Sequence, residues 1–318
     1  NCNTMSDNKQ VKPKHKKFKR KAKTIKEQKH EKGQYFTTNT FLKENVYKLI
    51  KNNPSLILEP SIGQGDLIDY IKKNREEIQF HSYEIDRTIP LLSSIKNENV
   101  VYGDFLEQNI MLKYDTIVGN PPYVKTQSGN LYLDFINKCY ELLNDNGELI
   151  FIVPSDFIKL TSASKIINNM LSNGTFTHII HPNNESLFLN ASIDIIIFRY
   201  CKNNKLSNSI LFNDQPKFLI NTNGIITFSD NEEQNMKTLS EYFSIFVGMV
   251  TGKESVFKNE EYGNITILSN KNTTNNYILL DKFPTDNDKL NKYMLAHKSE
   301  LISRKIKKFT DKNWYEWG

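Results

Sequence analysis

The chain has 318 residues, of which 38% are hydrophobic and 25% are charged, a balance that suits a soluble globular protein of one large domain plus part of a second. Its formal charge of +6 and its pI near 8.9 favour a polyanionic partner. Three scattered cysteines without metal-ligand spacing argue against a disulfide framework or a zinc site. No segment resembles a signal sequence or approaches the roughly 20 apolar residues of a membrane span. We therefore expect a cytoplasmic protein with neither a metal nor a membrane among its partners.

A dense basic run precedes the first regular pattern. Residues 12–32 are rich in lysine and hold few apolar residues, so this stretch has no core to join, and we expect residues 1–32 to form a disordered basic arm. A solvated tail or localisation signal explains such a run about as well as contact with nucleic acid. Any phosphate contacts that it made would be independent of sequence and sensitive to salt.

Apolar residues after position 40 alternate between helical and strand spacing. The pattern predicts a helix over 41–50, a strand over 56–58, a helix from 67, a strand over 80–84, a helix over 87–96, strands over 100–102 and 116–118, a helix over 132–143, a strand over 149–153, a helix over 166–171 and strands over 176–180 and 193–198. This alternation predicts an α/β fold with a Rossmann-like, doubly wound, mostly parallel sheet of about seven strands. The last two apolar runs lie too close for a helical crossover, so we expect the final strand to be antiparallel.

Beyond Tyr200 the pattern changes to short β-like pieces separated by Asn, Asp and Gly. We expect a first domain over 33–241 and a second, partial domain over 242–318 that ends in aromatic residues inside a larger unit. A second group of basic residues falls in this part of the chain, at Lys298, Arg304, Lys305, Lys307 and Lys308. A solvated helix face explains that group about as well as phosphate contact.

Polar residues follow the first two predicted strands. The carboxyl ends of parallel strands meet at one edge of a sheet, where open α/β folds bind ligands. Residues 59–65 leave the first strand, and Gly63 and Gly65 within them let the backbone approach a ligand closely. Glu84 ends the second strand about 20 residues later, where an acid can accept both hydroxyls of a ribose. An ordinary βα loop explains residues 59–65 about as well when they are taken alone.

Asp104 and Phe105 follow the third strand. An Asp that accepts from an adenine amine, beside a Phe that flanks the ring, would make a nucleoside pocket. An acid at a strand end is a capping group more often than a ligand. Acids after three successive strands at one edge nevertheless favour a binding site.

The segment Asn120-Pro121-Pro122-Tyr123 follows the fourth strand. The two prolines fix φ at successive positions and hold their carbonyls rigidly. An amide oxygen, a carbonyl oxygen and an aromatic plane then lie at one spot, which suits a planar base carrying an exocyclic amine. A tight turn without a ligand is the alternative.

Five segments occur in a fixed order, namely Gly33–Thr37, Leu58–Gly65, Tyr83–Asp86, Gly103–Leu106 and Asn120–Tyr123. In this order they resemble the S-adenosylmethionine-dependent DNA adenine-N6 methyltransferases, in the gamma arrangement, in which the cofactor motifs precede the recognition domain. The resemblance extends from about Gly33 through Tyr200. It implies an enzyme that transfers the methyl group of S-adenosylmethionine to N6 of a flipped-out adenine in double-stranded DNA. It also implies a restriction-modification or similar DNA-marking role, residues 242–318 as the start of a target-recognition domain, and a separate restriction endonuclease as a candidate partner.

The resemblance also implies residue roles. The cofactor would be bound by Tyr35, Thr37, Glu59, Ser61, Gly63, Gly65, Glu84, Ile85, Asp104, Phe105 and Asn120. In the catalytic segment, Asn120 and the Pro121 carbonyl would bind the target N6, Pro122 would complete the motif, and Tyr123 would stack on the base. Phe188 matches the second aromatic residue of that clamp, with simple core packing as its alternative.

Three other functions remain open from the sequence. Release-factor glutamine methyltransferases share Asn-Pro-Pro-Tyr, but they carry a helical substrate domain where this chain has its lysine-rich arm. An RNA adenine methyltransferase is a closer alternative. A non-catalytic DNA-binding subunit of the same fold would usually have a broken Asn120 or cofactor loop, and both are intact here. The DNA sequence that would be recognised cannot be read from the chain.

Overall fold

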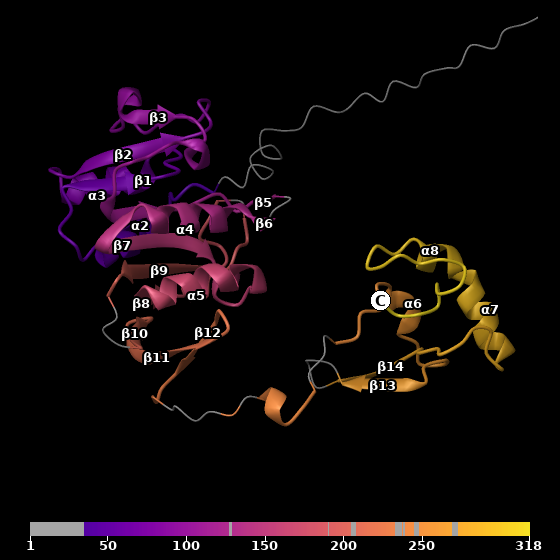
Figure 1. Cartoon of the computed structure of the whole chain (residues 1–318). Helices are drawn as coiled ribbons and strands as arrows, with labels where there is room; N and C mark the ends of the chain where they lie inside the picture. The colour runs from indigo at the N-terminus through magenta and orange to yellow at the C-terminus, as the bar shows by residue number, and fades with distance from the viewer. Residues whose placement is uncertain are drawn as a thin grey trace, which may run out of the picture. The chain divides into compact units, whose positions relative to one another are not determined.

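The computed structural model describes residues 35–318 except 127–128, 190, 205–207, 233–236, 238, 245–247 and 269–272. The predicted basic arm, together with Gly33 and Gln34, lies outside the described residues. The chain divides near residues 234 and 235 into two compact units (Figure 1). Each unit has its own hydrophobic core.

A ten-stranded sheet runs through the first unit. In spatial order its strands are β12 (Ile225–Ser229), β11 (Gln215–Thr222), β10 (Ser209–Phe212), β8 (Gly174–Ile180), β9 (Ile195–Lys202), β7 (Leu143–Pro154), β4 (Tyr114–Gly119), β1 (Leu56–Glu59), β2 (Gln79–Glu84) and β3 (Val100–Tyr102). Strands β3, β2, β1, β4 and β7 pair in parallel, and β9 lies antiparallel between β7 and β8. The predicted α/β fold, with its mostly parallel sheet and antiparallel last strand, is confirmed.

Three strands extend the sheet beyond the predicted seven. Strand β10 pairs in parallel with β8, and β11 and β12 add an antiparallel ribbon at the edge. Their apolar runs were visible in the sequence, but nothing in so short a pattern indicates which edge of a sheet it joins.

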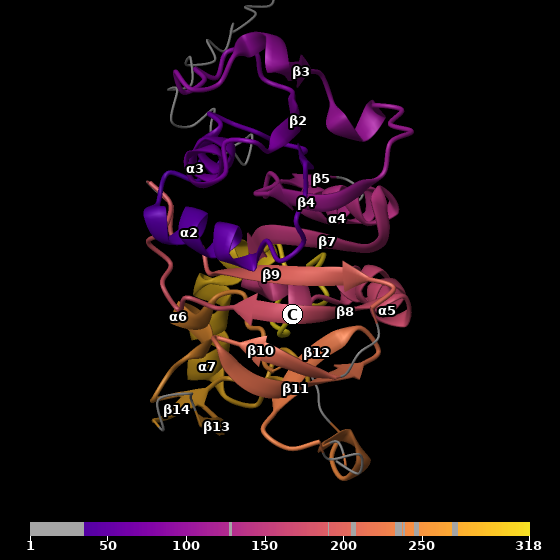
Figure 2. The ribbon, with the colours of Figure 1, turned by 90° about the vertical axis from the view of Figure 1, so that its left-hand side faces the viewer.

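Helices cover both faces of the sheet (Figure 2). On one face lie α2 (Thr40–Leu49) and α3 (Asp66–Asn74), and on the other lie α4 (Leu131–Glu141) and α5 (Ser164–Ser172). Helix α2 begins after Asn39, whose side chain accepts a hydrogen bond from the Phe41 N–H and so satisfies one of the free amides of the first turn. Its stripe of Leu42, Val46 and Leu49 is buried against the sheet.

The predicted helix over 87–96 is wrong. These residues form turns, because Pro90 lacks an amide hydrogen and its ring clashes with the preceding turn of a helix. Ile89 and Ile95 still supply apolar contacts, Ile89 being 8% exposed and Ile95 packing on a small cluster beside β3. Helix α4 also ends two residues earlier than predicted, at Glu141. A short hairpin of β5 (Lys125–Thr126) and β6 (Gly129–Asn130), which was not predicted, follows the Asn120–Tyr123 segment.

The second unit is built from α6 (Glu254–Phe257), the hairpin of β13 (Ile265–Leu268) and β14 (Thr274–Tyr277), α7 (Asp288–Ala296) and α8 (Lys298–Ile302). Trp314 lies at the centre of its core and is 2% exposed. Arg304 is also buried, and it donates hydrogen bonds to the carbonyls of Leu301, Thr251, Trp314 and Glu316.

The buried position of Arg304 changes the basic group predicted from the sequence. Its guanidinium lies 3.7 Å from the ring centroid of Phe309, so it stabilises the core of the second unit and does not belong to an exposed basic surface. Lys298 is paired with Asp311 at 2.6 Å, and Lys307 with Glu316 at 3.2 Å. Phosphate contact by Arg304 is therefore ruled out in this state, and two of the lysines are partly neutralised.

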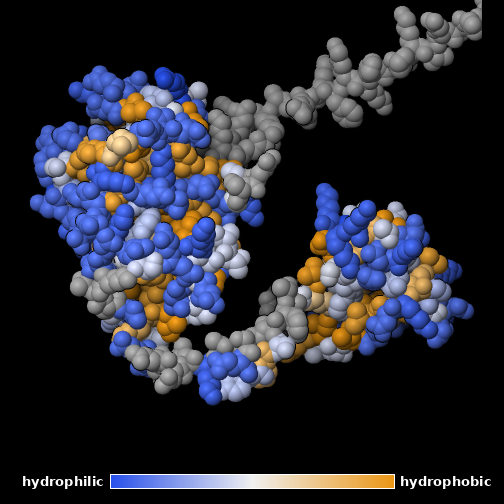
Figure 3. Space-filling model, in the orientation of Figure 1, coloured by the Kyte–Doolittle hydropathy of each residue, from blue (hydrophilic) through white to orange (hydrophobic). Residues whose placement is uncertain are grey.

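In Figure 3, hydrophilic residues cover much of the visible face of each unit, and hydrophobic residues gather in smaller patches between them. Among the helices of the described residues, none is long and apolar enough to span a bilayer.

Candidate active site

A cavity of about 460 Å³ lies at the carboxyl ends of β1 to β4. Most of the residues predicted to bind the cofactor line it, namely Tyr35, Ser61, Gly63, Glu84, Ile85, Asp104, Phe105 and Asn120. Thr37 and Glu59 line a small adjoining pocket, and Gly65 caps the start of α3. The polar residues that follow the parallel strands therefore lie together at one edge of the sheet, at this cavity.

Several apolar wall residues were missed by that argument. Phe36, Ile89 and Phe135 also line the cavity. Phe36 lies within the Gly33–Thr37 segment, so its place in the resemblance was the available signal. Phe135 belongs to the apolar stripe of α4, and periodicity alone cannot separate a residue that lines a ligand cavity from one that fills the core.

Glu84 organises the loop that leaves β1. Its Oε2 accepts a hydrogen bond from Gly63 N at 2.9 Å, and its Oε1 accepts one from Asp86 N at 2.9 Å. Gly63 and Gly65 have φ values of +56° and +94°, which side chains disfavour. A Cβ on Gly65 would also lie 2.5 Å from Ile95 Cγ1. Both glycines are thus favoured by the backbone geometry of this loop.

Buried carboxyl groups line the cavity, at Glu84, and the small adjoining pocket, at Glu59 and Asp66. Glu59 is 2% exposed, and its burial, with a contribution from the nearby Glu84, raises its pKa to about 8. Burial also raises the pKa of Glu84 and of Asp66. Burial thus favours the neutral form of these acids, and a positive charge bound beside them would lower their pKa values again.

The loop that carries Phe105, a wall residue of the cavity, is fixed by hydrogen bonds from α4. Lys138 of α4 donates to the carbonyls of Phe105 at 2.6 Å, Leu106 at 2.9 Å and Gln108 at 2.6 Å. The Phe105 ring also stacks on Phe135, with centroids 5.5 Å apart. Lys138 therefore fixes the loop after β3 through three backbone carbonyls.

Asp104 caps the short 3₁₀ turn that follows it, since its Oδ1 accepts from Leu106 N at 2.9 Å. It also lines the cavity. The capping and ligand-binding interpretations of this acid are therefore compatible, because a carboxylate has further lone pairs with which to accept a second donor.

The amide of Asn120 is held in one orientation. Its Nδ2 donates to the Tyr35 carbonyl at 2.7 Å and to Thr37 Oγ1 at 3.1 Å. Its Oδ1 accepts from the Tyr123 hydroxyl, and the Ile152 carbonyl, 3.0 Å from the same hydroxyl, shares its single hydrogen. Two acceptors around Nδ2 fix which end of the amide is the oxygen, so Asn120 presents an acceptor on the Tyr123 side.

The other residues of the segment lie beside this amide. Pro121 is buried, and Pro122 lines the cavity. The backbone carbonyl of Asn120 accepts from Ser61 Oγ at 3.3 Å. This bond joins the loop after β1 to the loop after β4, so the two sets of predicted residues form one site.

Phe188 lies next to Tyr123. Their ring centroids are 6.2 Å apart with planes at 72°, and Phe188 is 3% exposed. This position suits both interpretations of Phe188, as a clamp residue and as core packing, so the clamp role remains a prediction. The loop that carries Phe188 is closed at its base, where His181 Nε2 and Asp194 Oδ1 are 2.8 Å apart.

No group of three or more His, Cys, Asp or Glu side chains that could hold a metal ion occurs within the described ranges.

A family model described as Eco57I restriction-modification methylase matches residues 36–188. The Type II methyltransferase M.HincII of Haemophilus influenzae is 29% identical over 221 residues, which cover 63% of this chain and 43% of the relative. The Type II methyltransferase M.AccI of Acinetobacter calcoaceticus is 24% identical over 270 residues, covering 66% and 50%. The modification methylase CviBIII of Paramecium bursaria Chlorella virus NC1A is 35% identical over 151 residues, covering 41% and 40%.

This chain thus spans half or less of the length of these relatives. The matches support a relationship with the methyltransferases of restriction-modification systems. Among solved structures, the methyltransferase subunit of a type I restriction-modification system from Streptococcus thermophilus aligns with a TM-score of 0.46 at 17% identity, covering 62% of this chain and 50% of that one.

Proposed function

We propose that this protein transfers the methyl group of S-adenosylmethionine to N6 of an adenine flipped out of double-stranded DNA, as the modification enzyme of a restriction-modification system. The observation that carries the proposal is the position of the Asn120 amide. It lines a largely apolar cavity of about 460 Å³ that also holds Glu84, Asp86 and Asp104, with the Tyr123 hydroxyl on its acceptor side. The matches to restriction-modification methyltransferases support the reaction class.

The chemistry of the cavity residues fits this cofactor. Glu84 can accept from ribose hydroxyls, and Asp104 from the adenine amine between Ile85 and Phe105. Glu59 and Ser61 lie toward Asn120, which is where the methionine end with its two cationic groups would be held. When bound, S-adenosylmethionine supplies an activated methyl group.

The residues of the Asn120–Tyr123 segment would prepare the attacking amine. The N6 lone pair of adenine is delocalised into the ring and is a poor nucleophile. Asn120 Oδ1 and the Pro121 carbonyl would accept its two hydrogens and localise the lone pair, a preorganised electrostatic effect. Tyr123, with Phe188, would hold the base in line with the methyl group. The amine proton would leave to water.

The remaining parts of the chain would serve DNA binding. Residues 242–318 would begin the target-recognition domain, and the basic arm over 1–32 would contact phosphates independently of sequence. Flipping the base costs about a few kcal/mol, so binding energy from these parts would contribute to holding the adenine outside the duplex. A separate restriction endonuclease would be the enzyme's partner in the cell, and the cytoplasm its location.

The test is transfer of tritium from labelled S-adenosylmethionine to genomic DNA from a strain without adenine methylation. We expect label in N6-methyladenine with the wild-type protein and a loss of at least about a hundredfold with Asn120→Ala, the scale found when one preorganised hydrogen-bonding group is removed from an active site. Asn137→Ala, which removes an exposed amide on α4, is the matched control and should retain activity. RNA and release factor serve as competing substrates, and label found in one of them alone would overturn the DNA assignment.

A further inference from the structure

Tyr35 lies against both aromatic residues of the proposed base clamp. Its ring stacks on Tyr123, with centroids 5.4 Å apart and planes at 28°. It also lies 5.7 Å from Phe188, tilted by 43°. These are the separations of ordinary aromatic contacts, so the three rings form one packed group.

In the proposed reaction a flipped base stacks on Tyr123, and the ring of Tyr35 already occupies one face of that residue. A base bound by this clamp stacks on the face of Tyr123 and touches Phe188, and it presents its amine to Asn120. Tyr123 and Phe188 are themselves in edge contact at 6.2 Å, and stacked rings are centred no closer than about 4.5 Å. A base therefore cannot stack on that face of Tyr123 while Tyr35 remains there.

The acceptor for the amine is engaged in the same state. Asn120 Oδ1 accepts from the Tyr123 hydroxyl. The single hydrogen of that hydroxyl can turn wholly to the Ile152 carbonyl, 3.0 Å away, once a base arrives. Asn120 Nδ2, by contrast, is held by the backbone carbonyl of Tyr35 and by Thr37. The ring of Tyr35 can thus move without releasing the amide, because only its backbone orients Asn120.

We infer that Tyr35 is a stand-in for the target base: its ring fills the base-binding slot beside Tyr123 and Phe188 in the DNA-free protein and is exchanged for the flipped adenine. The inference deepens the proposed function and rests on it. It adds a selection step, because an entering base must replace the stacking that Tyr35 provides. A planar base that also offers an amine to Asn120 can do so, and a group without both features cannot.

Substituting the ring separates this role from cofactor binding, in which Tyr35 was also predicted to take part. Tyr35→Ala removes the stand-in and keeps the backbone carbonyl, whereas Tyr35→Phe keeps the ring and removes only the hydroxyl. The probe is 2-aminopurine 2′-deoxyriboside, whose fluorescence is quenched on stacking, titrated in saturating S-adenosylhomocysteine so that the cofactor cavity is filled. We expect Tyr35→Ala to bind the probe about tenfold more tightly than the wild type, the scale of one base–aromatic stack. Tyr35→Phe should bind like the wild type.

Two controls keep the outcome interpretable. The gain should vanish in the double variant Tyr35→Ala/Tyr123→Ala, and a gain that persisted there would place the probe outside the slot and overturn the inference. If Tyr35→Ala fails to fold, judged by its melting temperature and its affinity for S-adenosylhomocysteine, Tyr35→Leu carries the same expectation. A folded variant that binds the probe no more tightly than the wild type also overturns it.

Failure of this inference is distinguishable from failure of the proposed function, because methyl transfer to DNA by the wild-type protein is measured separately. DNA methylation without a gain in probe affinity would reject the stand-in role alone. A gain in affinity without methyl transfer would support the slot and reject the reaction.

Discussion

Glu59 is a buried acid whose titration can be followed through protein stability. Its pKa in the folded protein is about 8 because burial penalises the charged form, whereas an unfolded glutamate titrates near 4.3. The folded state therefore holds the proton more tightly than the unfolded state. The stability that this provides is fully present below about pH 4.3 and is lost as the pH rises through 8.

We expect Glu59→Gln, which cannot ionise, to abolish this loss. Between pH 5 and pH 8 the unfolding free energy of the wild type should fall relative to that of the variant by a few kcal/mol, since one pKa unit corresponds to about 1.4 kcal/mol. Urea titrations at the two pH values measure the difference. They should be followed by circular dichroism, because both tryptophans, Trp314 and Trp317, lie in the second unit.

Glu77→Gln is the matched control for this experiment, because Glu77 is largely exposed and its pKa is lowered by hydrogen bonding to its own backbone and to Arg75. It should leave the pH dependence close to that of the wild type. Parallel stability curves for the wild type and Glu59→Gln would contradict the assignment of a raised pKa to Glu59.

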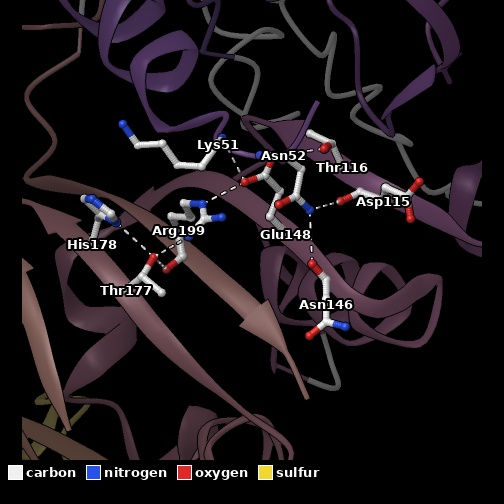
Figure 4. Close-up of polar contacts among 9 residues, drawn as sticks. All are labelled: Lys51, Asn52, Asp115, Thr116, Asn146, Glu148, Thr177, His178 and Arg199. Atoms are coloured by element: carbon white, nitrogen blue, oxygen red, sulfur yellow. Dashed lines mark hydrogen bonds and ion pairs between the residues drawn. The ribbon is translucent and has the colours of Figure 1, made fainter. Parts of the chain in front are cut away.

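At the scale of elements, one carboxylate ties α2, β4, β7 and β9 together (Figure 4). Glu148 of β7 is 0% exposed, and its Oε2 accepts from Arg199 Nε at 2.7 Å and from Lys51 N at 3.1 Å. Its Oε1 accepts from Thr116 Oγ1 at 2.9 Å and from Asn52 N at 3.1 Å. The segment after α2 is thus anchored to the sheet, because the Lys51 and Asn52 backbone amides donate to this buried carboxylate.

Glu148→Gln should destabilise the first unit by roughly 3–5 kcal/mol, because it leaves the Arg199 guanidinium buried without its counter-charge. Denaturant unfolding followed by circular dichroism measures the loss. Glu44→Gln, which breaks the exposed pair of Glu44 with Lys48, is the matched control and should change stability by less than about 1 kcal/mol. A Glu148→Gln effect as small as that of the control would contradict a desolvated ion pair.

Periodicity predicted most of the elements, because the buried stripe of α2 and the apolar runs of β4 and β7 are local signals in the sequence. It failed at residues 87–96. The apolar residues there are spaced as in a helix, but they lie in turns around Pro90. The ion pair of Glu148 with Arg199 was not predicted, since the two residues are far apart in sequence and meet only through the β7–β9 register.

The sequence also predicted part of the candidate site. Glu84, Asp104 and Asn120 each lie at the end of a predicted parallel strand. Because such strand ends meet at one edge of a sheet, the sequence alone predicts that these three residues lie close together. The contact of Tyr35 with Tyr123 could not be predicted, because it depends on how the segment before α2 crosses the rim of the sheet. Such a path is set by tertiary packing, for which a single sequence carries no periodic signal.

At the scale of the whole molecule, positive charge is concentrated in residues 12–32. Deleting residues 1–32 should weaken binding to duplex DNA of any sequence and reduce the steepness with which affinity falls with salt, because each phosphate contact that is lost removes about 0.9 from the slope of log K against log salt. Fluorescence anisotropy between 50 and 200 mM salt measures both quantities.

Lys298→Gln/Lys307→Gln provides the control for this deletion, since both lysines already pair with acids of the second unit. It should change the slope less than the deletion does. Equal slopes for the full chain and the deleted one would instead identify the arm as a solvated tail.

The place of β9 between β7 and β8 has a consequence for synthesis of the chain on the ribosome. Until Ile195–Lys202 has left the exit tunnel, β7 and β8 each present an unpaired, apolar edge to solvent. Exposed edges of this kind associate readily with other chains. Between the emergence of Ile180 and that of Lys202 from the tunnel, the nascent protein therefore exposes edges that can associate with other chains, and a pause in synthesis that falls in this interval prolongs the exposure.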